Sequence, residues 1–176
     1  MVLDLDQLNT GVMGLTPEFG SFCLQACTVC LDNSKHVNGV TAPLTGVSPN
    51  SITLNWSSLV TAQIKRNWAD MQETLEYGAT AIAILLASKI TTYTCIERSS
   101  KGTGFDYWLG NENSLGIFQQ KARLEISGIL SESATNTLDS RIKTKITQTQ
   151  KSAALKLDAH ICVTEFSNPK CEYQVV

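Results

Sequence analysis

The sequence contains neither a long apolar segment nor an excess of one charge. Its longest apolar run, residues 79–87, includes Thr80 and is far shorter than the ~20 residues that a helix needs to cross a bilayer. The formal net charge of −2 lacks the basic excess usual in proteins that bind nucleic-acid phosphates without specificity. The N-terminal residues Met-Val-Leu-Asp-Leu-Asp have neither the basic nor the apolar region of an export signal. These absences predict a cytoplasmic protein without a membrane role.

Internal repeats, low-complexity tracts and linkers are also lacking, so nothing divides the chain. Hydrophobic residues make up 43% and charged residues 17%, and the mean hydropathy of −0.03 indicates a globular protein rather than a disordered one. A chain of 176 residues buries roughly 70% of the surface of its unfolded form, enough for a core without disulfides. We therefore predict one domain, residues 1–176, with a β-rich N-terminal extension (residues 1–56) and a core (residues 57–168).

Six cysteines are present, but a reducing compartment disfavours disulfide pairs. Cys23, Cys27 and Cys30 have the C-x3-C-x2-C spacing that iron–sulfur enzymes of the radical SAM type use, and His36 could complete a zinc set. A cysteine-based metal module is therefore one hypothesis for this chain.

The residues around this cysteine cluster favour a different interpretation. Residues 22–31 have the composition of a strand that enters a turn, and residues 37–44 form a second strand after it. On a strand, Cys30 points to the face opposite Cys23 and Cys27, so the three thiolates do not converge. We predict that the three cysteines are buried core residues.

A long helix is predicted after a third N-terminal strand at residues 52–56. Ser57 or Ser58 caps this helix, and apolar residues recur along it at intervals of three to five residues. They define the face that is expected to be buried: Leu59, Ile64, Trp68, Met71, Leu75, Ala79, Ile82 and Leu86.

Three strands, a second helix and a last strand follow. Residues 90–97, 104–109 and 122–127 are rich in the β-branched and aromatic residues typical of strands. Ser131 or Ser133 begins the second helix, and residues 159–166 form the last strand before Pro169. The buried stripe of the second helix is predicted to comprise Leu138, Ile142, Ile146, Ala153 and Leu157.

This order from residue 57, helix, strand, strand, strand, helix, strand, resembles the αβββαβ core of the PD-(D/E)XK nuclease superfamily. The family carries an acidic residue on its second core strand and an acid-x-Lys motif on its third. Asp106 within Gly104-Phe-Asp106 matches the first element, and Glu125 matches the second, with Ser127 where lysine is expected. The resemblance implies an α/β (α+β) restriction-endonuclease-like fold, a mixed sheet flanked by helices, here with an N-terminal β-hairpin extension.

The resemblance also implies a magnesium-dependent endonuclease that acts on DNA, in DNA processing or in defence. Mg²⁺ prefers hard oxygen ligands and keeps several waters, so carboxylates on two neighbouring strands suffice to hold it. Asp106 and Glu125 are the predicted metal ligands and catalytic residues, and no organic cofactor is expected. The metal would activate a water and stabilise charge on the phosphoryl oxygens.

Because Ser127 cannot carry a positive charge, another residue has to supply the catalytic cation. Lys145 is the leading candidate, since it lies one turn from Gln148 at the edge of the apolar stripe of the second helix. In some members of the superfamily the lysine is displaced onto this helix, with a glutamine as companion. Lys143 and Lys121 are weaker candidates. Similar proteins often carry a further acidic residue on the first helix, here Glu76 or Glu73.

Each of these residues also has a purely structural interpretation. Asp106 and Glu125 could pair with Arg98 or Arg123, and a helix face of lysine and glutamine is commonly solvated. The alternative function is therefore a catalytically inactive nuclease-fold module for binding or assembly. DNA as partner and a homodimer both remain predictions of the nuclease hypothesis.

Overall fold

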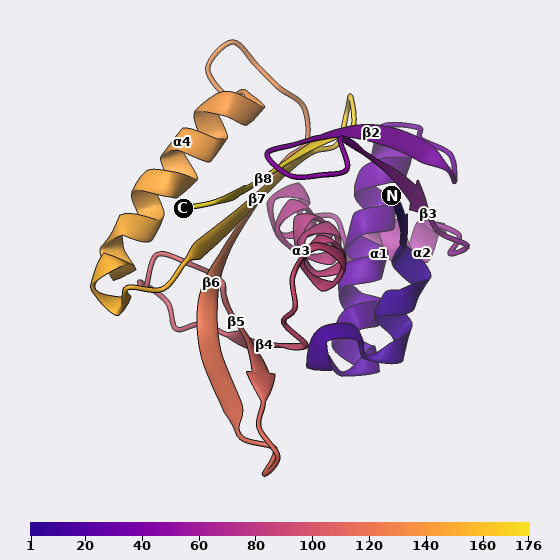
Figure 1. Cartoon of the computed structure of the whole chain (residues 1–176). Coiled ribbons are helices and arrows are strands. Elements are labelled where there is room, and N and C mark those ends of the chain that lie inside the picture. The colour runs from indigo at the N-terminus through magenta and orange to yellow at the C-terminus, as the bar shows by residue number, and fades with distance from the viewer.

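The computed structural model describes all residues, 1–176, and its centre is a single mixed sheet of eight strands. The strand order is β1-β3-β2-β8-β7-β6-β5-β4. The predicted fold class, an α/β fold with a mixed sheet flanked by helices, is confirmed (Figure 1). The strands are β1 (Val2–Asp4), β2 (Val40–Thr45), β3 (Ser51–Asn55), β4 (Cys95–Arg98), β5 (Tyr107–Glu112), β6 (Phe118–Ile129), β7 (Ala159–Glu165) and β8 (Lys170–Val175).

Helices cover both faces of the sheet. α3 (Met71–Ile90) packs against β6 and β7 on one face, and α1 (Pro17–Asn33) packs on the outside of α3. α4 (Leu138–Thr149) lies alone on the opposite face, as Figure 1 shows. α3 approaches β6 closely because Gly128 has no side chain: a Cβ there would lie 2.7 Å from the carbonyl oxygen of Leu75. None of the helices is both long enough and apolar enough to span a membrane.

The predicted succession of elements after residue 57 is present, with shifted boundaries. β4, β5 and β6 form an antiparallel meander, and α4 connects β6 to β7, which runs parallel to β6. The first helix continues to Ile90, so β4 begins only at Cys95 instead of residue 90. α4 begins at Leu138, after the N-cap Thr137, and not at Ser131 or Ser133.

The prediction of a strand at residues 22–31 is wrong, because this segment belongs to the helix α1. Thr16 caps the helix by accepting from the amide of Phe19, and Pro17 occupies the first turn, where its missing N–H costs nothing. Cys23, Cys27 and Cys30 follow the helical spacing i, i+4, i+7 and so share one buried face.

The prediction of one long helix from Ser57 is also wrong. A short helix, α2 (Ala62–Asn67), is capped by Thr61, and α3 starts separately behind the N-cap Asp70. Leu59, expected on the buried face, is 84% exposed. Trp68 lies between the two helices and is buried against α1, with its ring 4.5 Å from that of Phe22.

The N-terminal strands and the C-terminal strand β8 belong to one sheet, which the sequence did not predict. β8 follows Pro169 and pairs antiparallel with β7, whereas residues 159–166 were expected to be the last strand. The hairpin of β2 and β3 joins the sheet through parallel pairing of β2 with β8, and β1 pairs parallel with β3. The N-terminal residues therefore extend the same sheet.

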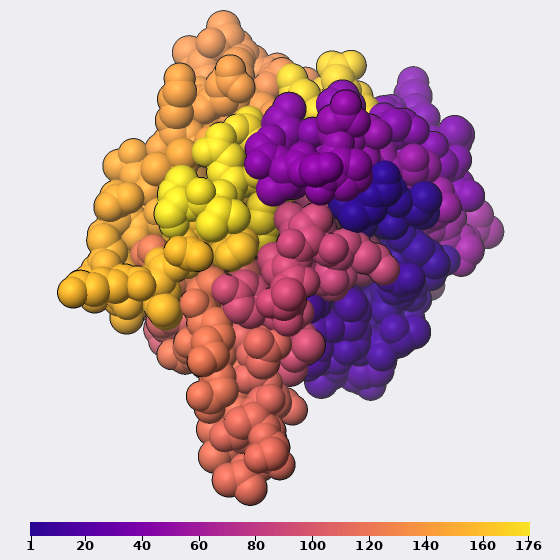
Figure 2. Space-filling model, in the orientation of Figure 1, coloured from indigo at the N-terminus to yellow at the C-terminus, as the bar shows by residue number.

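The β5–β6 hairpin extends past the rest of the sheet. β4 pairs with β5 only as far as Gly110, so the hairpin beyond it has two strands. Figure 2 shows it as a narrow arm that projects from the body. Leu115 and Ile117 at its tip are 80% and 55% exposed.

Candidate active site

The predicted site residues of β6 and α4 face one another in pairs. Two residues along the strand span nearly the same distance as four residues along the helix. Glu125 and Ser127 are two residues apart on the strand, a rise of ~6.6 Å, and share one face. Lys145 and Arg141 are four residues apart on the helix, a rise of ~6 Å. The Lys145 Nζ atom donates to Glu125 Oε1 at 2.5 Å, and Arg141 Nη1 donates to Ser127 Oγ at 3.0 Å. α4 thus places one cation next to Glu125 and another next to Ser127.

Asp106 is fixed beside Glu125 by two hydrogen bonds to β6. Its amide donates to the carbonyl oxygen of Leu124 at 2.9 Å, and its Oδ2 atom accepts from the amide of Ile126 at 2.8 Å. Asp106 lies one residue before β5, and not inside the strand as predicted, yet these bonds continue the pairing of β5 with β6. Asp106 is thereby held against β6 at the start of β5, whereas Glu125 lies within β6.

The Glu125 carboxylate is fully buried, and only one of its two oxygens accepts a hydrogen bond. Its Oε1 atom accepts from Lys145, but its Oε2 atom has no hydrogen-bond partner. Burial, followed by the nearby charge of Asp106, raises the pKa of Glu125 to about 7, although Lys145 acts in the opposite direction. Burial also raises the pKa of Asp106, against the opposing effects of the Ile126 amide and Lys145. An added positive charge between the two carboxyl groups would therefore be favourable.

These carboxylates suit a hard divalent cation that keeps part of its water shell. The Oε2 atom of Glu125 is buried without a partner, and the nearby charge of Asp106 raises the Glu125 pKa. Mg²⁺ commonly takes only one or two protein carboxylates and fills its other positions with water and phosphate oxygens. No group of three or more His, Cys, Asp or Glu side chains is placed to hold a metal. The two carboxylates of Asp106 and Glu125 are the groups in this site that a divalent cation would use.

The structure brings Gln148 and Glu76 to the same place. Gln148 Oε1 accepts from Lys145 Nζ at 3.2 Å, so Lys145 bridges the glutamine and Glu125. Glu76, on α3, forms an ion pair with Arg98 at 3.2 Å and lines the same cleft as Asp106. Glu73, the alternative to Glu76, is exposed in the first turn of α3 and does not line this cleft.

The weaker lysine candidates, and Arg123 as one of the two suggested arginine partners, lie away from the two carboxylates. Lys143 and Lys121 are exposed and contact neither carboxylate. Arg123 is buried and donates to the carbonyl oxygens of Thr149 and Leu157, so it attaches the end of α4 to the sheet and does not pair with Asp106 or Glu125.

A cleft of about 700 Å³ opens at the end of the meander, beside these residues. β5 pairs with β6 only as far as Tyr107 opposite Leu124, so β6 has no strand on that side from Glu125 onward. The N-terminal part of α3 lines one wall and α4 lines the other, with Asp106 at one end. A second hollow of about 330 Å³ continues past Asp106 along the β4–β5 loop toward Gln148.

The lining of the two hollows is more positive than the protein as a whole. Its acidic residues are Glu76 and Asp106, with Glu125 buried behind them. The cations outnumber them, although the net charge of the chain is −2. They are Arg98, Lys101, Arg141, Lys145 and Lys151.

The cysteine cluster takes no part in this cleft. Cys23, Cys27 and Cys30 are buried in the core, and burial raises the pKa of Cys23 and of Cys30 to about 12. They are therefore protonated at neutral pH, and a thiol in that state is a poor metal ligand. The predicted core role agrees with this burial, whereas the strand on which that prediction rested is a helix.

Comparisons of the chain with protein-family models, with curated proteins and with solved structures gave no match.

Proposed function

We propose that the protein is a magnesium-dependent endonuclease of the PD-(D/E)XK type that cleaves DNA. One observation carries the proposal: Lys145 of α4 donates to Glu125, whose second oxygen is buried and unpartnered, and Asp106 is close enough to raise the pKa of Glu125. Two carboxylates could hold the metal of a metal-assisted phosphodiester hydrolysis, and an ammonium group beside them would stabilise negative charge. The order αβββαβ, with acidic residues on or next to the second and third strands, supports the same assignment.

Lys145 takes the place of the lysine that the motif has at Ser127. Serine is neutral, whereas the Lys145 ammonium reaches the same carboxylate from the helix opposite. A cation there, next to the attacking oxygen, stabilises negative charge that develops on the phosphoryl group. Gln148 holds the ammonium group from the other side and limits its freedom.

Asp106 and Glu125 would hold Mg²⁺, with Glu125 contributing Oε2. The metal, when bound, would supply Lewis acidity that lowers the pKa of a water and neutralises phosphoryl charge. The protein positions the two carboxylates before any ligand arrives, because backbone bonds to β6 fix Asp106 and burial fixes Glu125. Glu76 lies at the cleft mouth, where its ion pair with Arg98 keeps it next to the path of a substrate.

Nicking of supercoiled plasmid DNA tests this proposal directly. The parent is expected to convert the plasmid to nicked and linear forms with Mg²⁺ and not with EDTA. Asp106→Ala, Glu125→Ala and Lys145→Ala are expected to abolish cleavage, whereas Lys143→Ala, which removes a cation of the same helix outside the cleft, keeps it. Circular dichroism melts of each variant exclude unfolding as the cause.

The second candidate is a nuclease-fold module without catalysis. It is favoured by the close Lys145–Glu125 ion pair, which satisfies one carboxylate oxygen without any metal. Calorimetric titration of Mg²⁺ and Mn²⁺ separates the two. Binding to the parent that is lost in Asp106→Ala supports the enzyme. No binding, together with no nicking, would leave the inactive module.

A further inference from the structure

Among the three cations that line the cleft of about 700 Å³, Arg98, Arg141 and Lys145, only Arg141 has no carboxylate partner. Lys145 is paired with Glu125 and Arg98 with Glu76, but Arg141 has no acidic group within ion-pair distance. Its partners are neutral: Nη1 donates to Ser127 Oγ at 3.0 Å, and Nε and Nη2 donate to Asn136 Oδ1 at 3.2 and 2.7 Å. The full positive charge of the guanidinium group is therefore left available.

These bonds leave two donors of Arg141 unused, and Arg141 lines the cleft. A guanidinium group has five N–H donors in a fixed plane. Three of them are used by Ser127 and Asn136, so one on Nη1 and one on Nη2 remain. Arg141 is half-buried and lines the cleft with Asn136 and Ser127. A guanidinium group with free N–H donors and a net charge is suited to bind phosphate oxygens.

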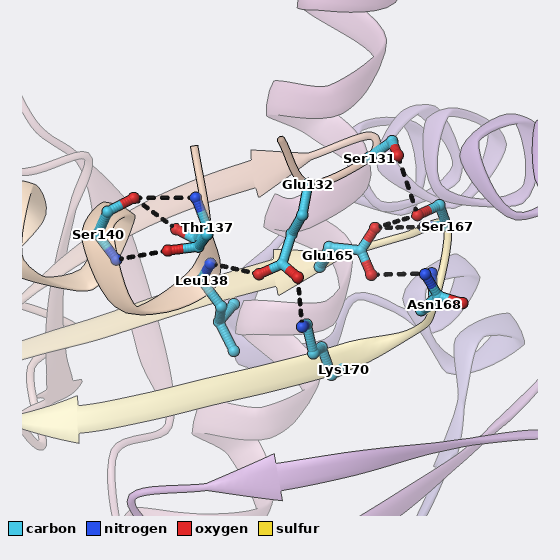
Figure 3. A network of polar contacts seen from close by, with 9 residues as sticks. All are labelled: Ser131, Glu132, Thr137, Leu138, Ser140, Glu165, Ser167, Asn168 and Lys170. Carbon is cyan, nitrogen blue, oxygen red and sulfur yellow. Dashed lines mark hydrogen bonds and ion pairs between the residues drawn. The ribbon is translucent and has the colours of Figure 1, made fainter. Parts of the chain in front are cut away.

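The segment that carries Asn136 is itself held in place. Figure 3 shows Glu132, in the β6–α4 loop, accepting from the amide of Leu138 and from Lys170, each at 2.6 Å. Thr137 and Ser140 cap each other at the start of α4. The loop therefore fixes Asn136, and Asn136 fixes the plane of the guanidinium group before a ligand binds.

We infer that Arg141 is a phosphate-binding residue that holds a phosphodiester of the DNA strand next to the one that is cut. This inference rests on the proposed function. Arg141 lies one helical turn, ~6 Å along the helix axis, from Lys145, and both side chains line the same cleft. Asn136 acts through Arg141 as its positioning residue.

DNA binding without metal tests the inference separately from catalysis. Fluorescence anisotropy with a labelled 30-nucleotide DNA, single- and double-stranded, is measured in EDTA from 50 to 300 mM KCl. Arg141→Ala is expected to weaken binding about tenfold, because a charge-assisted bond is lost. The slope of log K against log salt for duplex DNA is expected to fall by about 0.9, one phosphate contact. Lys143→Ala, the matched control on the exposed face of α4, is expected to change neither.

Asn136→Ala and Arg141→Lys extend the test. Both keep the positive charge but lose the fixed plane, so each is expected to retain the salt slope and to weaken binding by less than Arg141→Ala. Melting curves of all variants confirm that they are folded. Equal salt slopes in the parent and Arg141→Ala, or no binding of either DNA by the parent, would overturn the inference.

Cleavage assays with Mg²⁺ distinguish this inference from the proposed function. If the parent binds DNA with an Arg141-dependent slope but never cleaves it, the nuclease proposal fails and the phosphate site stands. If the parent cleaves DNA and Arg141→Ala keeps the parental KM and salt slope, the enzyme stands and the phosphate site fails. A higher KM with a nearly unchanged kcat is expected for Arg141→Ala.

Discussion

Replacement of Glu125 by glutamine should change how the stability of the metal-free protein depends on pH. The side chain is fully buried, and its pKa is raised from the ordinary 4.5 to about 7. The folded state therefore binds a proton more tightly than the unfolded state does. Stability from this group is fully present below about pH 4.5 and is lost as the pH rises through about 7. Glutamine has nearly the same shape and does not titrate. The Glu125→Gln variant should therefore not lose this stability as the pH rises.

The size of the effect follows from the two pKa values. A difference of one pKa unit corresponds to 1.36 kcal/mol, so ionisation of Glu125 costs the folded protein roughly 3 kcal/mol. Asp106 titrates together with Glu125, and its raised pKa acts in the same direction. The pKa of His160 is lowered by burial, which destabilises the fold at low pH, but the parent and the variant share this effect.

Urea unfolding of the parent and Glu125→Gln, at several pH values from 4.5 to 8.5 with EDTA present, measures the difference. The free energy of unfolding of the parent is expected to fall relative to that of the variant by roughly 3 kcal/mol across this range. With Mg²⁺ in place of EDTA at pH 8, the parent should recover stability and the variant should gain less. A difference that stays constant with pH would refute the reasoning, since it would mean that Glu125 ionises in the folded protein as it does in water.

Three further predictions test the site and the core. Mg²⁺ at a concentration of 100 times its Kd should stabilise the parent by ~2.7 kcal/mol in thermal melts and leave the melting temperature of Asp106→Ala unchanged. Lys145→Ala should lower kcat by roughly 10²- to 10³-fold, because a preorganised charge is lost. Lys145→Arg keeps the charge and should recover part of the rate. Equal rates in the parent and Lys145→Ala would show that Lys145 has no part in the mechanism. Trp68→Ala should cost roughly 3–5 kcal/mol in urea unfolding, because the ring is only 5% exposed and packs on Phe22, and a parental stability would contradict that burial.

The sequence predicted the part of the fold in which local patterns and tertiary packing agree. Residues 122–127 are apolar at every second position, and they lie within β6. Glu125 stands out there as the acidic residue in an apolar strand. Lys145 and Gln148 could be selected because helical spacing is regular enough to place both at the edge of a buried stripe.

The elements that were wrongly predicted have sequence patterns that suit more than one structure. Residues 22–31 are apolar at nearly every position, which suits a buried strand and a buried helix equally. The capping residue Thr16 with Pro17 favours the helix, and these two residues were the signal that could have decided it. Ser57 resembles a cap as closely as Thr61 does, so the start of α2 was misplaced.

Arg141 could not have been identified from the sequence. Its role depends on the alignment of α4 with β6, which places it over Ser127, and on Asn136 in the preceding loop. Neither partner is charged, so no pattern of opposite charges marks the site. The sequence shows Ser127 at the position of the motif lysine, but it does not show that Arg141 contacts this serine.

The projecting β5–β6 arm separates the tip of the hairpin from the chemistry of the cleft. Glu125 follows Ile117 at the tip by eight residue steps, which at ~3.3 Å per step places the tip about 26 Å from Glu125 along the strand. The turn at Ser114 and Gly116 is therefore a position where a fluorophore or an inserted peptide tag can be attached without entering the cleft. A donor dye there and an acceptor on a DNA end would report the direction in which a bound strand runs.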